Sequence, residues 1–532
     1  MNDGIGNVNA DAAPWLARRS RTAFWIAWVA LSAVRLALAA TIAPFGDEAW
    51  YWQESRALDW AYSDLPPATA WLIRAGETIA GHGVLGMRLP FLVLGALVPL
   101  MVVRVARRTF GERAGWRAGL AALGMPLLAT LGIFALPDVP LTLASALALD
   151  ACERAAHTRR LRDWSALGCA LAFAWLCHYR AAMLLVAGLV FLCATPRGRS
   201  LWRAPGLWLA LALSCVGLVP ILVFNLAHDW SAVRFQLLER NPWRFQPDAL
   251  VQPVEQALVC TPLFYLLLLW AAWRSVRRAR CGRPWDLFAV CAVTPIVLYF
   301  VLGCFADDTR FRVHWPLQGY LPLLVALPAL AEDALGQRAH LAIRSAYAML
   351  ALGTVVAFAY LATAVVPGGA MALARVKAFP EHFVGWPDAA LETRALLDTP
   401  AFADDVLVAD NFMLAAELDF ALDGRRKVYS LDHPLNTKHG RAPQLAAWRR
   451  DEAALHALAG APVLLVAEPT TRRERERAAW MQGLCARIDV RAEAAKLDLY
   501  GGRKRYRWYS GTVPRETSGD ENRAECTAAT GW

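Results

Sequence analysis

The sequence predicts a polytopic α-helical membrane protein that also carries interfacial amphipathic helices and a small C-terminal α/β domain. Its composition is strongly apolar, with 57% hydrophobic residues and 23 Trp among 532 residues, whereas soluble domains lie closer to half apolar. The apolar residues form repeated runs of about 20 residues, the length that crosses a ~30 Å hydrocarbon core. Arginines cluster in the short loops between these runs, so the formal charge of +10 indicates membrane orientation rather than nucleic-acid binding.

We expect about eleven membrane spans within residues 1–366. The predicted spans are residues 22–44, 84–103, 115–135, 139–153, 164–179, 181–194, 206–227, 252–273, 286–304, 316–331 and 343–366. Arginines precede the first span and recur after the second, fourth, sixth and eighth, so these segments face the cytoplasm. The other loops, and all residues after 366, then lie on the periplasmic side of a bacterial inner membrane. The first run contains Arg35 and is too long for the core of a signal peptide, so we expect it to be retained.

Residues 45–83 form the first predicted outer loop. Two segments in it, residues 47–59 and 68–80, have the pattern of amphipathic helices that lie in the membrane interface. Between them, Pro66 and Pro67 exclude a continuous helix, while Pro67 suits the start of the second one.

The composition becomes soluble after residue 366, which predicts a periplasmic α/β domain over residues 367–532 with a loose tail from about residue 514. We expect strands at 406–408, 463–466 and 498–509 and helices at 411–422 and 443–458. Cys485 and Cys526 are the cysteines of this outer region, and whether they form a disulfide stays open.

Asp47 and Glu48 directly follow the first span and precede the aromatic run that includes Tyr51. Carboxylates at the edge of a bilayer are costly to desolvate, so this pair indicates a functional site. Neighbouring residues of a helix point about 100° apart, so one of the two faces a given substrate atom. The alternative is structural, because acidic residues also favour the first turn of a helix.

Asp138 stands in a very short outer turn between Pro137 and Pro140. The prolines predict a tight reversal, and the topology places this carboxylate on the same side and at the same level as Asp47. The pattern is weak alone, since Asp is a common turn residue.

Several polar groups lie at the outer ends of other spans, and the positive ones among them oppose the positive-inside bias and therefore need partners. An anionic lipid head group or a diphosphate-like ligand would supply them, and snorkelling or interfacial anchoring is the alternative. These groups are His178, Arg180, Asn225, His228, Asp229, Gln236, Arg240, Arg312 and His314.

Taken in order, several motifs resemble the polytopic glycosyltransferases that use polyprenyl-phosphate sugars. This GT-C-like superfamily includes the protein O-mannosyltransferases and the aminoarabinose transferase of lipid A, and the likeness is greatest to its bacterial branch. The motifs are Asp47-Glu48-Ala49-x-Tyr51-Trp52, Tyr62-x-Asp64-x-Pro66-Pro67, Arg88-Leu89-Pro90, Pro137-Asp138-x-Pro140, His228-Asp229-Trp230-Ser231 with Phe235-Gln236, Trp315-Pro316 with Tyr320, and Ala415-Ala416-Glu417-Leu418-Asp419-Phe420. Each is weak singly, but their order and spacing are specific. Leu65 departs from the pattern where relatives have Lys or His, so that phosphate contact must come from elsewhere.

The resemblance implies that Asp47 is the general base, that Asp138 is a second acidic site and that Glu48 is a reserve base or an orienting group. The predicted donor-phosphate ligands are Arg88, Arg180, Arg312 and His314, and the predicted substrate contacts are Tyr51, Tyr62, Asp64, His228, Asp229 and Gln236. No cofactor is predicted with certainty. Whether a divalent metal ion binds at Asp47 and Asp138 stays open, since two carboxylates alone make a poor divalent site.

The expected function is therefore transfer of a sugar from polyprenyl phosphate to a hydroxyl acceptor by a single inverting displacement. The donor already carries a good leaving group, so the reaction needs a base for the acceptor hydroxyl and cations for the departing phosphate. The sugar, the acceptor (lipid A or another glycolipid, a glycan or a protein) and the oligomeric state stay open. A glycosidase is one rival, but it would not need eleven spans. A lipid-linked sugar flippase is the other, but the polar motifs here gather on the outer side.

Overall fold

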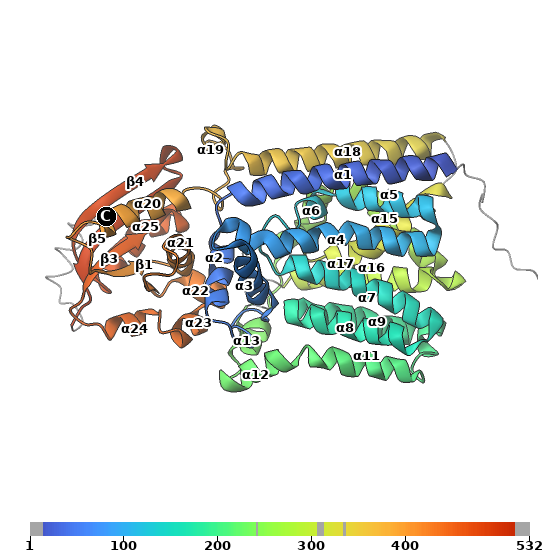
Figure 1. Cartoon of the computed structure of the whole chain (residues 1–532), viewed down its shortest axis with the longest axis horizontal. Helices are drawn as coiled ribbons and strands as arrows, with labels where there is room; N and C mark the ends of the chain where they lie inside the picture. Colours follow the sequence, from blue (N-terminus) through green and yellow to red (C-terminus); the bar gives the residue numbers. More distant parts are fainter. Residues whose placement is uncertain (1–13, 241–242, 306–312, 334–336, 516–532) are drawn as a thin grey trace, which may run out of the picture.

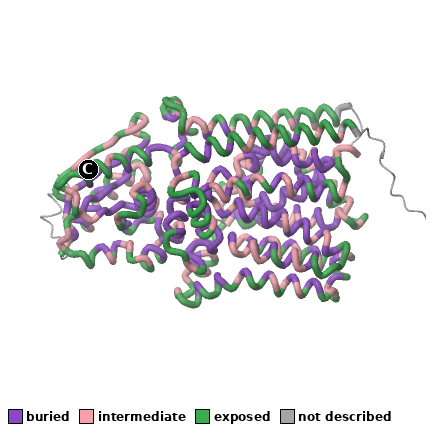
Figure 2. Tube along the Cα trace, in the orientation of Figure 1, coloured by how far each residue is buried: buried purple, intermediate pink, exposed green. Residues whose placement is uncertain are grey.

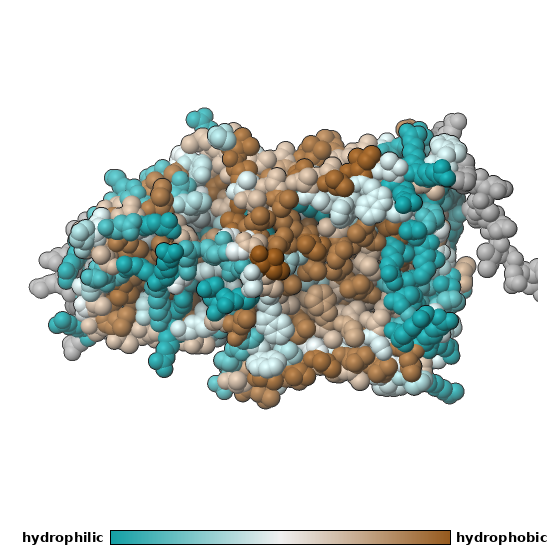
Figure 3. Space-filling view, in the orientation of Figure 1, coloured by the Kyte–Doolittle hydropathy of each residue, from teal (hydrophilic) through white to brown (hydrophobic). Residues whose placement is uncertain are grey.

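The computed structural model describes residues 14–240, 243–305, 313–333 and 337–515. The chain forms a bundle of long helices and, at one end of the bundle, a part that contains a β-sheet (Figure 1). Apolar side chains cover the flank of the bundle, whereas hydrophilic side chains cover its far end and much of the sheet-containing part (Figure 3). This distribution suits helices that cross a bilayer and a domain that stands outside it.

The bundle is built from helices that follow one another through short connections. They are α1 (Pro14–Thr41), α4 (Val84–Phe110), α5 (Glu112–Gly124), α6 (Pro126–Ala129), α7 (Asp138–Thr158), α8 (Leu161–Cys177), α9 (Ala182–Ala194), α11 (Pro205–Val216), α12 (Val219–Ala227), α14 (Gln252–Cys260), α15 (Pro262–Arg278), α16 (Trp285–Gly303), α17 (Leu317–Glu332) and α18 (Gln337–Ala362). Within the described residues, five helical segments are long and apolar enough to cross a membrane, or six if one bent pair counts as a span. The multi-pass architecture is confirmed, and the number of eleven spans is not.

Two predicted spans are interrupted where a proline starts a new helix. The chain leaves the helix at Met125, before Pro126, so a continuous helix over 115–135 is wrong. It bends by 111° at Thr261, before Pro262, so a straight helix over 252–273 is also wrong. The physical reason is the same, because the proline ring disfavours the α conformation of the preceding residue.

The two helices predicted in the outer loop are present as α2 (Gly46–Arg56) and α3 (Ala68–Ala80). α2 does not lie in the interface as expected, because α21 (Phe412–Ala421) packs against it and its residues from Glu48 to Ser55 are buried. α3 exposes Trp71 and Ile79, which suits an interface. However, it buries Glu77, whose carboxylate accepts a hydrogen bond from the indole N–H of Trp52.

The sheet has five strands in the order β2-β1-β3-β5-β4, with β2, β1 and β3 parallel and β5 and β4 antiparallel. The strands are β1 (Val406–Ala409), β2 (Val428–Ser430), β3 (Pro462–Ala467), β4 (Asp489–Leu499) and β5 (Lys504–Thr512). The strands expected at 406–408 and 463–466 are confirmed by β1 and β3. The single strand expected at 498–509 is wrong, because Gly501 and Gly502 take positive φ and turn the chain into the β4-β5 hairpin.

Helices cover both faces of this sheet. One face is covered by α20 (Trp386–Leu397) and α21, and the other by α24 (Glu452–His456) and α25 (Glu474–Leu484). The remaining helices of this part are α19 (Gly369–Leu373), α22 (Pro434–Lys438) and α23 (Ala442–Ala447). The core between the layers is buried throughout (Figure 2). The helix expected at 443–458 is two helices, α23 and α24, because Asp451 caps a new N-terminus by accepting from the N–H of Ala454. Cys526 lies outside the described residues, so whether it pairs with the buried Cys485 stays open.

Two carboxyl groups lie at the carboxyl ends of neighbouring parallel strands, Asp410 after β1 and Glu468 after β3. Asp410 is fully buried and accepts hydrogen bonds from the N–H of Glu468 at 3.1 Å and the amide of Asn411 at 2.7 Å. The Lys504 ammonium binds Glu468, at 2.7 Å. Burial, and then the negative charge of Glu468, raise the pKa of Asp410 to about 7.

The raised pKa of Asp410 should make the stability of the fold depend on pH. The folded protein keeps this proton up to about pH 7, whereas the unfolded chain releases it near the ordinary value of 3.8. This group therefore favours folding at low pH, and the benefit is lost as the pH rises through 7. We expect Asp410→Asn to raise the melting temperature in detergent at pH 8 and to change it much less at pH 5. The exposed Asp404→Asn is the control, and equal pH slopes for wild type and Asp410→Asn would contradict the prediction.

Candidate functional site

Asp47 and Glu48 lie in the first turn of α2 and have different surroundings. Gly46 opens the helix at a close approach to α21, since a Cβ there would lie 2.6 Å from Met413. Acidic residues in the first turn complement the helix dipole. Asp47 lines a cavity, whereas Glu48 is fully buried and does not.

Glu48 forms a bidentate ion pair with Arg88 of α4, with N–O distances of 2.8 and 2.5 Å. The N–H of Ala135 donates to the same carboxylate at 2.7 Å. The other Arg88 donors bind three carbonyl oxygens between residues 39 and 43, so all five N–H groups of the guanidinium are used. Arg88 as a phosphate ligand and Glu48 as a reserve base are therefore wrong, because the protein saturates both groups. Glu48 keeps the orienting role.

Asp138 is the first residue of α7 and lines the same cavity as Asp47. The turn before it needs Gly132, whose φ is +91° and whose Cβ would lie 2.7 Å from a carbonyl oxygen of α4. Arg180 forms an ion pair with Asp138, and the Nε2 atom of His314 lies 3.4 Å from the same carboxylate. Opposite charge at this distance favours the ionised carboxylate.

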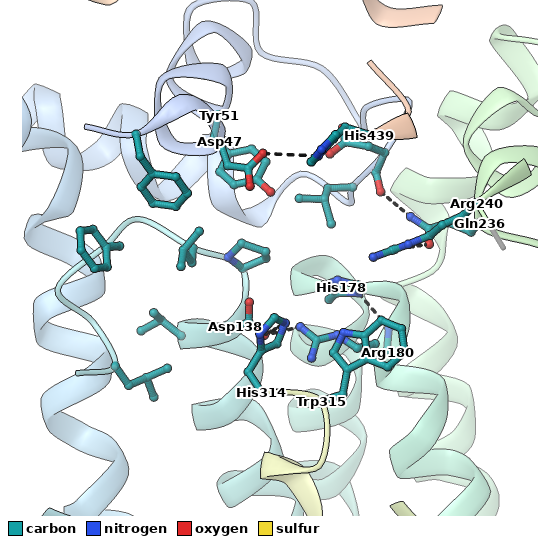
Figure 4. A pocket seen from close by; sticks show the side chains of 18 of the residues that line it. Asp47, Tyr51, Asp138, His178, Arg180, Gln236, Arg240, His314, Trp315 and His439 are labelled. Carbon is teal, nitrogen blue, oxygen red and sulfur yellow. Dashed lines mark hydrogen bonds and ion pairs between the residues drawn. The ribbon is translucent and has the colours of Figure 1, made fainter. Parts of the chain in front are cut away.

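The cavity between the two carboxylates has a volume of about 370 Å³. In Figure 4, Asp47 and Tyr51 lie on one side of it, and Asp138, Arg180 and His314 lie on the other. The charged residues that line it are the carboxylates Asp47, Asp64 and Asp138 and the cations Arg180, Arg240, Lys438 and Arg441. Both predicted acidic sites are thus brought together with cations around them.

The sequence analysis missed the contribution of the soluble domain to this cavity. Lys438 ends α22, and His439 follows it with Nδ1 at 3.9 Å from Oδ1 of Asp47. Arg441 donates to the same oxygen at 3.3 Å and forms an ion pair with Asp64. The run Lys438-His439-Gly440-Arg441 places three basic residues in four positions, and this cluster was the available signal for an anion site.

A second acidic residue, Glu54, lies beside Asp64 behind Arg441. Burial raises the pKa of both carboxyl groups, and the charge of Asp64 raises that of Glu54 further, while Arg441 acts in the opposite direction. Glu54 Oε2 and Asp64 Oδ1 are buried oxygens that accept no hydrogen bond from an N–H or hydroxyl of the described residues. Two buried carboxyl groups side by side favour the neutral form of one of them.

The other predicted site residues divide into two groups. Tyr51, Asp64 and Gln236 line the cavity, and the amide of Gln236 donates to the carbonyl oxygen of Asp64 at 2.7 Å. Tyr62, His228 and Asp229 do not line it. The Tyr62 hydroxyl donates to the carbonyl of Glu54 at 2.9 Å and so secures the end of α2.

His228 and Asp229 form the turn after α12. The His228 ring stacks on Phe224, and Asp229 is exposed. Substrate contact by these two residues is not supported, since their side chains lie in a helix end outside the cavity. Arg312 lies outside the described residues.

Comparisons with known proteins find similar chains among membrane glycosyltransferases. The profile of the dolichyl-phosphate-mannose-protein mannosyltransferases matches residues 64–224. The lipid A galacturonosyltransferase RgtD of Rhizobium johnstonii is 27% identical over 396 residues, which cover 73% of this chain and 79% of RgtD. ArnT from Cupriavidus metallidurans, solved with undecaprenyl phosphate, superposes with a TM-score of 0.62 at 16% identity, over 92% of this chain and 98% of ArnT. The chain is a GT-C membrane glycosyltransferase.

The predicted superfamily, fold class and enzyme class are thereby confirmed. The Archaeoglobus fulgidus oligosaccharyltransferase shares the fold of this glycosyltransferase, with a TM-score of 0.51 at 12% identity over 92% of this chain and 73% of the other. The cavity that contains Asp47 and Asp138 lies where the helical bundle meets the soluble domain.

The glycosyltransferase should depend on the Glu48–Arg88 pair for stability. Glu48→Gln removes the negative charge and leaves a buried guanidinium unpaired, which costs about 3–5 kcal/mol. We expect a large fall in the melting temperature of the purified protein in detergent. Glu112→Gln breaks the exposed pair with Arg107, which is worth at most about 1 kcal/mol, and serves as the control. Equal melting temperatures for the two variants would show that the buried pair is not important.

Proposed function

We propose that this glycosyltransferase moves a sugar from a polyprenyl-phosphate donor to a hydroxyl of a lipid acceptor, in a single inverting displacement at the periplasmic face. The acceptor oxygen forms the new bond to the anomeric carbon, the bond from that carbon to the phosphate breaks, and Asp47 takes the hydroxyl proton. The observation that carries this proposal is the position of Asp47, which is half-buried and lines the cavity opposite a group of cations. A carboxylate base of this kind supplies roughly 10²–10⁴-fold in rate.

The cations around Asp138 suit the departing phosphate. Arg180 and His314 both contact this carboxylate, and Arg240 lies nearby in the same cavity. Because the phosphate gains negative charge as the bond breaks, cations that are already positioned stabilise the transition state. We therefore assign Asp138 the role of holding Arg180 and His314 in place. These two residues would make the contact to the phosphate that Leu65, an apolar residue, cannot make.

A second cavity offers a place for the lipid part of the donor. It has a volume of about 240 Å³. Its lining includes Arg180 and Arg240, which also line the first cavity, and apolar side chains such as Met183 and Leu302. ArnT, which has the same fold, was solved with undecaprenyl phosphate. We place the phosphate at the shared arginines and the first isoprene units among the apolar groups.

We further propose that the reaction uses no resident metal ion. The described residues contain no group of three or more His, Cys, Asp or Glu side chains that could hold one. In addition, Asp47 is paired with Arg441 and Asp138 with Arg180, so each carboxylate already has a cation in the position that a metal would take.

The sugar that we favour is an acidic one, a uronic acid, and the acceptor that we favour is lipid A. The relative RgtD is a lipid A galacturonosyltransferase. The carboxylate of a uronic acid needs a cation of its own, in addition to the cations that bind the phosphate. Lys438 lines the cavity and has no carboxylate partner among the described residues. The enzyme would act in the inner membrane, with its N-terminus in the cytoplasm and its site in the periplasm.

The role of Asp47 is tested by Asp47→Asn. We expect transfer to fall by roughly 10²–10⁴-fold with unchanged membrane insertion, because an amide cannot take the proton. The measurement is mass spectrometry of lipid A from a deletion strain that carries the variant, followed by the transfer rate of the purified protein. Asp229→Asn, an exposed acid of the same outer face, should behave as wild type. Near wild-type transfer by Asp47→Asn, or release of intact donor lipid on the other side of a vesicle without transfer, would overturn the proposal.

The acidic sugar is tested at Lys438. Lys438→Gln should lower kcat/KM about 10- to 100-fold for a polyprenyl-phosphate-linked galacturonic acid, the loss expected for one charge-assisted hydrogen bond. It should leave the residual activity on a neutral galactose donor unchanged, and Lys438→Arg should retain the preference. An equal effect of Lys438→Gln on both donors would contradict the assignment.

A further inference from the structure

Arg441 is the side chain through which the soluble domain reaches the proposed base. It precedes α23 and is 2% exposed. Its Nη2 atom lies 3.3 Å from Oδ1 of Asp47, and its Nη1 atom is bound to Asp64. One planar guanidinium therefore links the carboxylate of α2 to the carboxylate of the turn that follows α2. The point charge of a lysine has no such fork.

Aromatic rings from both parts of the protein hold this guanidinium. The centroids of the Trp50, Tyr51 and Phe412 rings lie 5.0, 5.1 and 5.5 Å from its Cζ atom. Trp50 and Tyr51 belong to α2, and Phe412 begins α21 of the soluble domain. Cation–π contacts stabilise a desolvated guanidinium, so its orientation depends on both parts together.

The main chain on either side of Arg441 is fixed to the same turn of the membrane part. The Ser63 hydroxyl donates to the carbonyl oxygen of Gly440 at 2.5 Å, and the N–H of Ser63 donates to the Gln444 side chain at 3.1 Å. The position of the guanidinium is thus set by its backbone as well as by its ion pairs, and it is fixed only when the two parts are docked.

The charges around Arg441 leave Asp47 as a carboxylate. Burial raises the pKa of Asp64 and of Glu54, whereas the guanidinium, which is paired with Asp64, acts in the opposite direction on both. Glu54 Oε1 is further satisfied by the Trp50 indole N–H at 2.8 Å. Asp47 is the remaining acid at this cation, and an ion pair with a buried guanidinium favours its ionised form.

We propose that Arg441 is a positioning residue of the transfer reaction, which holds Oδ1 of Asp47 and makes catalysis depend on docking of the soluble domain. The proposal rests on Asp47 as the base. Loss of the guanidinium has two consequences. The carboxylate turns away from the acceptor hydroxyl, and it takes up a proton at higher pH because its cation is gone.

The test compares Arg441→Gln, Arg441→Lys and Arg450→Gln in the full-length protein, with polyprenyl-phosphate-linked galacturonic acid and lipid A as substrates. Arg450 is the matched control, because it binds Asp419 at 2.6 Å, and Asp419 also accepts a hydrogen bond from Gln53 of α2. It is therefore another arginine of the same domain junction, but it does not line the cavity.

For Arg441→Gln we expect kcat to fall about 10²-fold with a nearly unchanged KM for the donor, since a misplaced catalytic group costs that much. The acid limb of its pH–kcat profile should move to higher pH. Arg441→Lys should recover part of kcat and most of the wild-type position of the acid limb. The lysine restores the positive charge but not the planar guanidinium that binds two carboxylates at once. Arg450→Gln should keep both the rate and the profile.

Wild-type kcat in Arg441→Gln, or a loss of kcat with an unmoved acid limb, would overturn the proposal. If Arg441→Gln does not fold, the double variant Arg441→Gln/Asp64→Asn removes the charge together with its partner, and the same two outcomes apply to it. Asp47→Asn measured in parallel separates the two proposals. If Asp47→Asn is inactive and Arg441→Gln is normal, only the positioning role fails, whereas an active Asp47→Asn removes the base itself.

Discussion

The buried ion pair between Glu48 and Arg88 is the constraint on which the geometry of the site depends. Arg88 ties the end of α1 to α4, and Glu48 ties α2 to Arg88 and to the N–H of Ala135. Ala135 lies in the turn that leads into Asp138. One fully desolvated pair therefore sets both the direction of the helix that carries Asp47 and the position of the loop that carries Asp138. Such a pair is retained only with its full set of hydrogen bonds, because a buried charge without them is costly.

A second set of charges joins the helical bundle to the soluble domain. Arg441 enters a pocket of rings and carboxylates on α2, and Lys438 and His439 come from the same segment. The active cavity is thus completed by residues almost 400 positions away from Asp47 in the sequence. The soluble domain therefore contributes side chains to the cavity and does more than cover the end of the bundle.

The balance of charge differs between the two sides of the cavity. On the Asp138 side, Arg180 and His314 surround one carboxylate. On the Asp47 side, the three acids Asp47, Glu54 and Asp64 surround Arg441. A base and a leaving group need opposite environments, and the low dielectric of a buried site strengthens each of them. The two acids that look alike in the sequence therefore suit different roles.

Much of the site was predictable where a motif and the topology agree. Asp47, Asp138, Arg180, Gln236 and His314 all lie at the outer ends of apolar runs, and all of them line the cavity. The same motifs also predicted three residues that do not line the cavity. The side chains of Arg88, Tyr62 and His228 instead contact main-chain carbonyl oxygens of the protein. A sequence does not distinguish a polar residue that faces a ligand from one whose hydrogen-bonding groups are filled by neighbouring carbonyl oxygens.

The sequence by itself determined the membrane character, the acidic residues at the bilayer edge and the soluble C-terminal domain. Apolar runs, and the positions at which they end, are local properties of a sequence. It also located β1, β3 and α21, whose patterns are strong. Only the tertiary structure decided which of Asp47 and Glu48 faces the cavity, and that Lys438, His439 and Arg441 belong to it. The reason is physical: the exposure of a carboxylate and the partner of a cation depend on contacts between segments hundreds of residues apart, and no local pattern records them.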